Sequence, residues 1–287
     1  MTVLRYIRMH GCGNDYVFID AFSQTPPPHP ELLARRLSDR HRSVGGDGLV
    51  LMLPPARPDC HARMRMFNAD GSEASLCGNA LRCMALWLHH AGHAPPRLTI
   101  EMHGRSIAAE VLTCESTPHL RGTVRITPAP PQSLNPQLPP PACFSRTVEL
   151  ADLHVPGLLH HPLQADPGNP HVVLFVRRLS DVPFQQLGPA IECHAAFPDR
   201  TNVEFAEPIQ PNTFEVRVWE RGSGETQACG SGACAVAIAA ASIGLVDPAQ
   251  AVHVQMAGGP LLVRLPTDGP LQLEGPAEEC CQGVISI

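Results

Sequence analysis

The chain has 287 residues, a formal net charge of −6, 31 prolines and only 17% charged residues. This length is sufficient for one large or two medium domains with a substantial hydrophobic core. The acidic balance and the lack of a basic block argue against nucleic acid or an anionic membrane as partner.

Short strands and one apolar helix dominate the first half of the chain. Residues 62–67 alternate in polarity as a half-buried strand does. The apolar run at residues 78–90 has helical periodicity, and residues 30–40 show a weaker helical pattern. The expected strands of this half are residues 4–10, 16–20, 49–53, 62–67, 98–102 and 106–112.

A proline-rich segment follows the first half. Residues 127–142 contain seven prolines, which exclude a helix or a central strand there. We therefore expect this segment to be the linker between two lobes. The expected lobes are residues 1–128 and residues 129–287, and it stays open whether the last dozen residues return to the first lobe.

The second half repeats the plan of the first. Residues 230–243 form its long helix, which is so uniformly apolar that we expect it to be buried on all sides. The expected strands are residues 147–150, 171–176, 201–205, 214–219, 252–256, 261–265 and 284–287. Each half is thus a set of strands around one apolar helix.

Each of these helices follows a cysteine in a similar frame. Cys77 and Cys229 both have a glutamate four residues before them, and a Gly-Asn or Gly-Ser step after them. Their offset of 152 residues (229 − 77) is close to half the chain, which favours a duplication. A helix N-terminus favours a thiolate, so we expect a lowered pKa for both thiols. One such thiol per lobe suits a reaction in which one group removes a proton and the other returns it.

The eleven cysteines also have ordinary interpretations. A free cysteine is often a small buried hydrophobe, which fits Cys83 and Cys234 on apolar helix positions but fits Cys77 and Cys229 less well. The cysteines lack the paired spacing of a zinc site, so we expect no metal. The first residues lack a secretory pattern, and the longest apolar run, residues 233–246, is too short to span a bilayer. A cytoplasmic protein with reduced thiols is the expectation.

Several polar residues are candidates for substrate contacts. Gly78 with Asn79, and Gly230 with Ser231, could offer backbone N–H groups to a carboxylate, which is compatible with ordinary helix capping. Glu220 and Arg221 could hold an ammonium and a carboxylate, or form a surface ion pair. The asparagines in clusters around residues 14, 68, 169 and 202 are also the normal residues of turns.

Together these residues form a pattern that is similar to the diaminopimelate epimerase family. The resemblance rests on residues 9–15 (MHGCGND), 67–73 (FNADGSE), 77–79 (CGN) with 82–83 (RC), 168–171 (GNPH), 200–204 (RTNVE) and 218–234 (VWERGSGETQACGSGAC). It covers nearly the whole chain and is most specific at the two cysteines. Two departures are Gly48, where members often have Gln, and residues 127–130 (TPAP), where Met-Gly-x-Pro is usual.

The resemblance implies a fold and a reaction. The fold is α/β (α+β), with two pseudo-symmetric lobes, each a curled, mostly antiparallel sheet around a central helix, and the active site in the cleft between the lobes. The reaction is the interconversion of LL- and meso-2,6-diaminopimelate in lysine and peptidoglycan precursor biosynthesis, without pyridoxal phosphate or metal. The small-molecule substrate is the expected partner, and a homodimer stays open as the assembly.

The resemblance also implies roles for individual residues. Cys77 and Cys229 are the acid–base pair. The residues implied to hold the reacting end are Asn14, Gly78, Asn79, Gly230 and Ser231. Those implied to hold the distal end are Asn68, Asn169, Asn202, Glu220 and Arg221. His171 belongs to the motif as a possible supporting residue, with no assigned role.

Three other functions stay open beside this one. A histidine or proline racemase of the same fold is the nearest, although the distal residues argue for a substrate with a second amino-acid group. Phenazine-biosynthesis isomerases of this fold lack the cysteine pair and are disfavoured. A non-catalytic binding protein or a thiol-redox protein is the alternative of another class, and a redox protein would need a reversible disulfide.

Overall fold

The computed structural model describes residues 3–74, 77–128, 145–150, 152–266 and 269–287. The chain divides into two compact units, and each is described by itself. The N-terminal unit comprises Met1–Pro128 and Glu274–Ile287, and the C-terminal unit comprises Ala129–Leu273. Most of the expected proline-rich linker, residues 129–142, lies outside the described residues.

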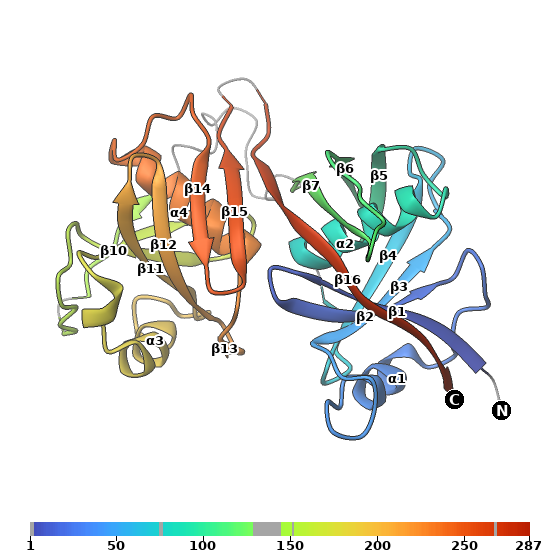
Figure 1. Ribbon diagram of the computed structural model, residues 1–287. Coiled ribbons are helices and arrows are strands. Elements are labelled where there is room, and N and C mark those ends of the chain that lie inside the picture. The colour runs from blue at the N-terminus through green and yellow to red at the C-terminus, as the bar shows by residue number, and fades with distance from the viewer. Residues whose placement is uncertain (1–2, 75–76, 129–144, 151, 267–268) are drawn as a thin grey trace. The chain divides into compact units, whose positions relative to one another are not determined.

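The strands of the N-terminal unit form a closed ring (Figure 1). Their spatial order is β1-β2-β3-β4-β5-β6-β7-β16, and β1 pairs with β16 to close the ring. Pairing is mostly antiparallel, but β2–β3 and β4–β5 are parallel. The strands are β1 (Val3–Gly11), β2 (Asn14–Asp20), β3 (Gly48–Leu53), β4 (Ala62–Asn68), β5 (Arg97–Met102), β6 (Arg105–Val111), β7 (Arg121–Thr127) and β16 (Gln272–Ser286).

Helix α2 (Gly78–His90) is the core of this ring. It contacts β1, β2, β5, β6 and β7, and nearly all its residues from Asn79 to Leu88 are buried. A second helix, α1 (Pro30–Leu37), packs on β3 and β4. The strands of the ring therefore enclose α2 and hold its N-terminus in place.

The C-terminal unit is built on a mixed sheet. Its order is β15-β14-β12-β11-β10-β9-β8, with the short β13 paired to β12. The strands are β8 (Arg146–Thr147), β9 (Leu163–Ala165), β10 (His171–Phe175), β11 (Asn202–Gln210), β12 (Thr213–Glu220), β13 (Gly224–Glu225), β14 (Val252–Met256) and β15 (Gly259–Arg264). The pairs β10–β11 and β12–β14 are parallel.

Helix α4 (Gly230–Ser242) packs against this sheet (Figure 1). It contacts β9, β10, β11, β14 and β15, and every residue from Gly232 to Ala240 is buried. This confirms the expectation of a helix that is buried all round. The 3₁₀ turn η2 (Leu179–Asp181) and the helix α3 (Phe184–Glu192) pack on β11 and β12.

Some element predictions were wrong. Residues 147–150 are a strand only at their first residue, and β16 is much longer than the expected strand 284–287. Helix α3 was not predicted, because Gly188 and Pro189 are normally helix breakers. Gly188 is placed there by packing, since a Cβ on it would lie 2.7 Å from the Trp219 ring. Strands β7 and β9 were not predicted either.

Within the described ranges, none of the helices combines the length and the apolar character needed to cross a membrane.

Candidate active site

In the N-terminal unit, Cys77 is the N-cap residue of α2. Its backbone is extended (φ −145°, ψ 106°), so the side chain turns back over the first helical turn. The Cys77 Sγ accepts a hydrogen bond from the Ala80 backbone N–H at 3.4 Å and lies 3.2 Å from the Tyr16 hydroxyl. The thiol is only partly buried. Such a sulfur is open to reaction and is next to the positive end of a helix dipole.

A buried arginine fixes the residue beside this cysteine. The Arg82 side chain is fully buried, and its Nη2 donates to Asn79 Oδ1 at 2.7 Å. Its Nε donates to the Pro276 backbone oxygen at 3.3 Å. The Asn79 amide thus has one orientation, set by a cation three residues along the helix. Arg82 belongs to the quoted motif but was given no role, although its i, i+3 spacing from Asn79 was a usable signal.

Asn14 and Asn68 lie at strand ends in the same unit. Asn14 begins β2 opposite Gly11, and Asn68 ends β4. The Asn68 Nδ2 donates to Ser72 Oγ at 2.9 Å, and its carbonyl accepts from the Gly71 N–H. Asn68 therefore does have the local turn role that was its ordinary alternative.

The residue after Asn14 anchors its strand. Asp15 is buried and accepts hydrogen bonds from the guanidinium groups of Arg8 and Arg40. Burial raises the pKa of the Asp15 carboxyl, but the two arginines outweigh burial and the net pKa is lowered. Arg40 also bonds Asp47, so the network ties residues 40–47 to the start of β2. The Asn14 position is held by this network.

In the C-terminal unit, Cys229 occupies the matching place as N-cap of α4. Its backbone is again extended (φ −126°, ψ 114°), and its Sγ accepts from the Gly232 N–H at 3.3 Å. The Ser231 hydroxyl lies 3.4 Å from the same sulfur. The Cys229 N–H donates to Met256 Sδ at 3.3 Å. The two cysteines thus share one local geometry, as the duplicated frames predicted.

The electrostatic setting of Cys229 differs from the expectation. Burial raises the pKa of the Cys229 thiol well above its usual value, and the nearby carboxylates of Glu220 and Glu204 raise it further. The expectation that the helix N-terminus lowers the pKa of both thiols is therefore wrong for Cys229. Desolvation of a nearly inaccessible sulfur (6% exposed) outweighs the helix dipole and the Gly232 N–H.

Glu220 is a titratable group beside this sulfur. Burial raises the pKa of its carboxyl, and the Thr226 hydroxyl donates to Glu220 Oε1 at 2.5 Å. The carboxyl therefore lies close to both the thiol and a hydroxyl. This position differs from a solvent-exposed ion pair, which was the ordinary alternative for Glu220.

His171 forms a fully buried pair with Glu204. The His171 Nδ1 lies 2.7 Å from Glu204 Oε1, and both side chains are 0% exposed. The His171 Nε2 lies 3.1 Å from Asn169 Oδ1, so the pair holds the Asn169 amide. A Cβ on Gly232 would lie 2.7 Å from Glu204 Oε1, which places the carboxylate against the first turn of α4. Glu204 lies within the quoted residues 200–204 but was given no role there.

Asn202 positions Arg221. Its Nδ2 donates to the Pro170 carbonyl at 2.8 Å, and its Oδ1 accepts from the Arg221 N–H at 2.9 Å. Both ends of the amide are engaged inside the protein. The Arg221 side chain is exposed and donates from Nη1 to the Asp199 carbonyl at 3.0 Å. Glu192, also missed, holds the adjoining turn through the Gly222 N–H and Trp219 Nε1.

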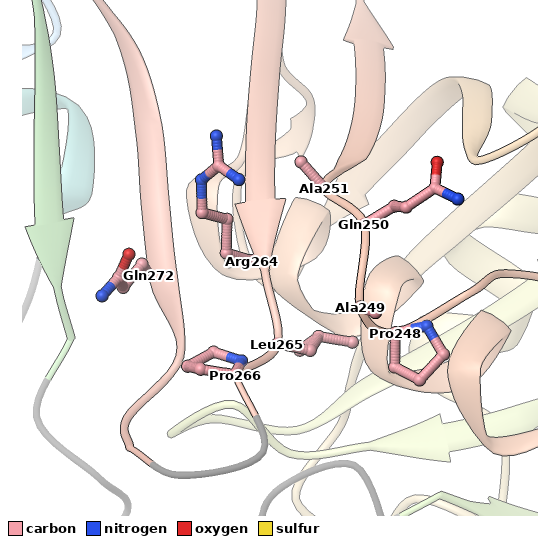
Figure 2. Close-up of a pocket in the computed structure, with 8 residues that line it drawn as sticks. All are labelled: Pro248, Ala249, Gln250, Ala251, Arg264, Leu265, Pro266 and Gln272. Atoms are coloured by element: carbon pink, nitrogen blue, oxygen red, sulfur yellow. The ribbon is translucent and has the colours of Figure 1, made fainter.

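One surface pocket lies elsewhere in the C-terminal unit (Figure 2). It has a volume of about 390 Å³, and its lining includes none of the candidate residues. The lining residues are Pro248, Ala249, Gln250, Ala251, Arg264, Leu265, Pro266 and Gln272. Among the residues that the structure describes, no group of three or more His, Cys, Asp or Glu is placed to bind a metal ion.

The chain is similar to known proteins over nearly its whole length. The family model of diaminopimelate epimerase matches residues 6–127 and 164–279. A diaminopimelate epimerase of Desulforudis audaxviator is 44% identical, with 98% of each chain covered. One of Stutzerimonas stutzeri is 38% identical over 99% of this chain and 100% of the relative.

Solved structures show the same fold at low identity. A phenazine biosynthesis protein of the PhzF family from Bacillus anthracis is 17% identical, with a TM-score of 0.69 and all of both chains covered. A hydroxyproline epimerase from Agrobacterium vitis is 15% identical, with a TM-score of 0.65, over 99% of this chain and 93% of that one. The expected sheet-rich α/β fold is thereby confirmed. By its sequence and its paired cysteine sites, the chain belongs to the diaminopimelate epimerase family.

Proposed function

We propose that this chain is an isomerase that interconverts LL- and meso-2,6-diaminopimelate, in lysine and peptidoglycan precursor biosynthesis. The observation that carries the proposal is the repeated cysteine site in a member of this family. Cys77 and Cys229 each cap a buried helix, and each Sγ accepts a backbone N–H. Two thiols with the same geometry suit a reversible reaction in which each acts as the base in one direction and as the acid in the other.

The proposed chemistry is a two-base exchange at the substrate Cα. A thiolate removes the Cα proton and becomes a thiol, and the electron pair of the C–H bond passes onto the substrate carboxylate. The other thiol then donates its proton to the opposite face of that carbon and becomes a thiolate. General acid–base groups of this kind typically contribute about 10²–10⁴-fold each.

The helix N-termini would stabilise the charged intermediate. Negative charge grows on the carboxylate as the proton leaves, and preorganised N–H groups stabilise such charge strongly. Asn14, Gly78 with Asn79, and Gly230 with Ser231 are the proposed contacts for this reacting end. Arg82 supports them because it fixes the Asn79 amide.

The distal amino-acid end needs a charged partner set. Arg221 is exposed and can offer its planar fork to a carboxylate, and Glu220 can meet an ammonium. Asn68 and Asn169 are proposed as further contacts there. Asn202 belongs to the same set. Its Oδ1 accepts a hydrogen bond from the Arg221 backbone N–H, so Asn202 acts by positioning Arg221.

The proposal includes independence from pyridoxal phosphate and metal. The chain has no lysine, all 21 basic residues being arginine, so a Schiff base with a lysine cannot form. Activity should survive dialysis against EDTA. A loss that an added metal reverses would contradict this part.

The cellular compartment and the oligomeric state are inferred from the proposed chemistry and tested separately. We infer a cytoplasmic enzyme, because it uses reduced thiols. A homodimer is the assembly that we would test first, by light scattering on the purified chain. A mass near 30.9 kDa instead of twice that value would contradict it.

The decisive experiment compares variants of the two cysteines with matched cysteine controls. Cys77→Ala and Cys229→Ala should each lower epimerisation by about 10³-fold or more. Cys114→Ala and Cys193→Ala remove exposed thiols and should leave it unchanged. Full activity in either folded site variant would overturn the two-base proposal. Better turnover of proline or histidine than of diaminopimelate would instead reject the substrate.

A further inference from the structure

Tyr16 contacts the reacting sulfur of the N-terminal unit. Its hydroxyl oxygen lies 3.2 Å from the Cys77 Sγ, and the tyrosine is only 4% exposed. The residue lies on β2, paired with Met9 on one side and Gly48 on the other. Its ring is further held edge-on to Phe18, with centroids 6.4 Å apart. The hydroxyl is therefore presented to the sulfur by a rigid part of the sheet.

The relative acidity of the two groups sets the direction of this hydrogen bond. A phenol has a reference pKa near 10 and a thiol one near 8.5, so the thiol loses its proton first. Once Cys77 is a thiolate it can only accept, and the phenol O–H is the donor. A hydrogen bond to an ionised group is stronger than one between neutral groups. The contact therefore favours the thiolate form of Cys77.

The cysteine of the C-terminal unit has an environment that favours the thiol. Cys229 is buried and lies near the carboxylates of Glu220 and Glu204, all of which favour its neutral thiol. Its hydroxyl neighbour is Ser231, a weaker acid than a phenol, at 3.4 Å. The two sites thus share a backbone geometry but differ in the side chains around the sulfur.

We propose that the Tyr16 hydroxyl donates a hydrogen bond to the Cys77 thiolate and makes Cys77 the sulfur that rests ionised, while Cys229 rests as the thiol. Tyr16 is then a further residue of the reacting centre, since it touches a reacting atom. Its part in turnover rests on the proposed epimerase function, but the ionisation of Cys77 does not depend on any substrate.

The test measures the ionisation of Cys77 directly, by its rate of alkylation with iodoacetamide across pH 5–10. Trypsin releases residues 66–82, in which Cys77 is the only cysteine, so mass spectrometry reports this thiol alone. Tyr16→Phe removes one oxygen and keeps the ring. The midpoint of the alkylation profile should rise by about one pH unit in this variant.

Tyr6→Phe is the matched control, because Tyr6 is the only other tyrosine in the chain. It lies on β1 with its hydroxyl near Gly283, and its profile should match that of the wild type. Equal midpoints in Tyr16→Phe and the wild type would overturn the proposal. So would a shift of equal size in Tyr6→Phe.

A second measurement needs no variant. In the wild type, the Cys77 midpoint should lie below that of Cys229. The Cys229 midpoint is read by fragment-ion mass spectrometry of the peptide of residues 222–264, because this peptide also contains Cys234. A lower midpoint for Cys229 would overturn the assignment of the resting thiolate. Neither alkylation measurement uses diaminopimelate. If the wild type failed to epimerise diaminopimelate, the proposed function would be rejected, but the assignment of the resting thiolate would not be affected.

Steady-state kinetics tests whether the Tyr16 hydroxyl also contributes to turnover. Near pH 7, Tyr16→Phe should lower kcat/KM by about tenfold, and the loss should shrink as the pH rises and Cys77 ionises without help. A loss that is the same at every pH would show a purely structural effect and would contradict the role in turnover.

Discussion

Individual side chains behind the two cysteines hold the groups that would meet the substrate. Arg82 fixes Asn79, the His171–Glu204 pair fixes Asn169, and Asn202 fixes the Arg221 backbone. All of these supporting residues lie in the quoted motifs, but Arg82 and Glu204 were given no role. A charged residue in a sequence gives no sign that it is fully buried.

Substitution of Arg221 tests the proposed contact with the distal carboxylate. Arg221→Lys keeps the charge but loses the planar fork, so it should bind a carboxylate poorly. A lost charge-assisted contact costs about 1.5–3 kcal/mol, which corresponds to a fall of about 10- to 150-fold in kcat/KM for diaminopimelate. Steady-state kinetics with a coupled assay would measure it. Unchanged kinetics would remove Arg221 from the proposed distal contacts.

Glu204 gives the second prediction. Glu204→Gln disturbs the fully buried contact of Glu204 with the His171 ring, and a disrupted buried hydrogen bond typically costs about 1–3 kcal/mol. The matched control is Glu225→Gln, which breaks a half-exposed ion pair with Arg217 and should cost less than about 1 kcal/mol. Urea unfolding of both variants would test the difference. Equal losses would show that burial of the pair contributes nothing.

At the scale of elements, the repeated strand–cysteine–helix plan was readable from the sequence. The helices that follow Cys77 and Cys229 lie where their apolar periodicity placed them, at Gly78–His90 and Gly230–Ser242. Helix α3 could not be predicted in this way, because packing against Trp219 overrides the poor helix propensity of Gly188 and Pro189 inside it. The length of β16 was also hidden, since its Gly275, Pro276 and Gly283 resemble turn residues.

The Asp15 network gives a prediction about the element that carries Asn14 and Tyr16. The native pKa of Asp15 is lowered, so its stabilisation is present above its unfolded pKa and is lost as the pH falls through the native value. Asp15→Asn should therefore lower the free energy of unfolding by about 2 kcal/mol at pH 7. The difference from the wild type should shrink below about pH 4.

Urea unfolding at pH 7 and at pH 3 measures this effect. Asp59→Asn is the control, because Asp59 pairs with Arg57 on the surface and should change stability little at either pH. A pH-independent loss in Asp15→Asn would mean that packing, and not the charge, holds this strand.

For the whole molecule, the family and the reaction follow from the motifs, while the raised pKa of Cys229 does not. The frames around Cys77 and Cys229 are similar, so they predict equal thiols. The pKa of Cys229 is raised by burial and by carboxylates from other strands of its unit, which no local pattern reveals. The asymmetry of the two sites is thus a property of tertiary structure.

The most direct test of the central claim is the reaction of the purified chain with LL-diaminopimelate in D₂O, followed by NMR and mass spectrometry. We predict that meso-diaminopimelate forms and carries solvent deuterium at the inverted Cα, and that neither Cys77→Ala nor Cys229→Ala forms it at more than about 10⁻³ of the wild-type rate. Formation of the meso isomer without deuterium at that carbon, or at the wild-type rate in either folded variant, would contradict the account.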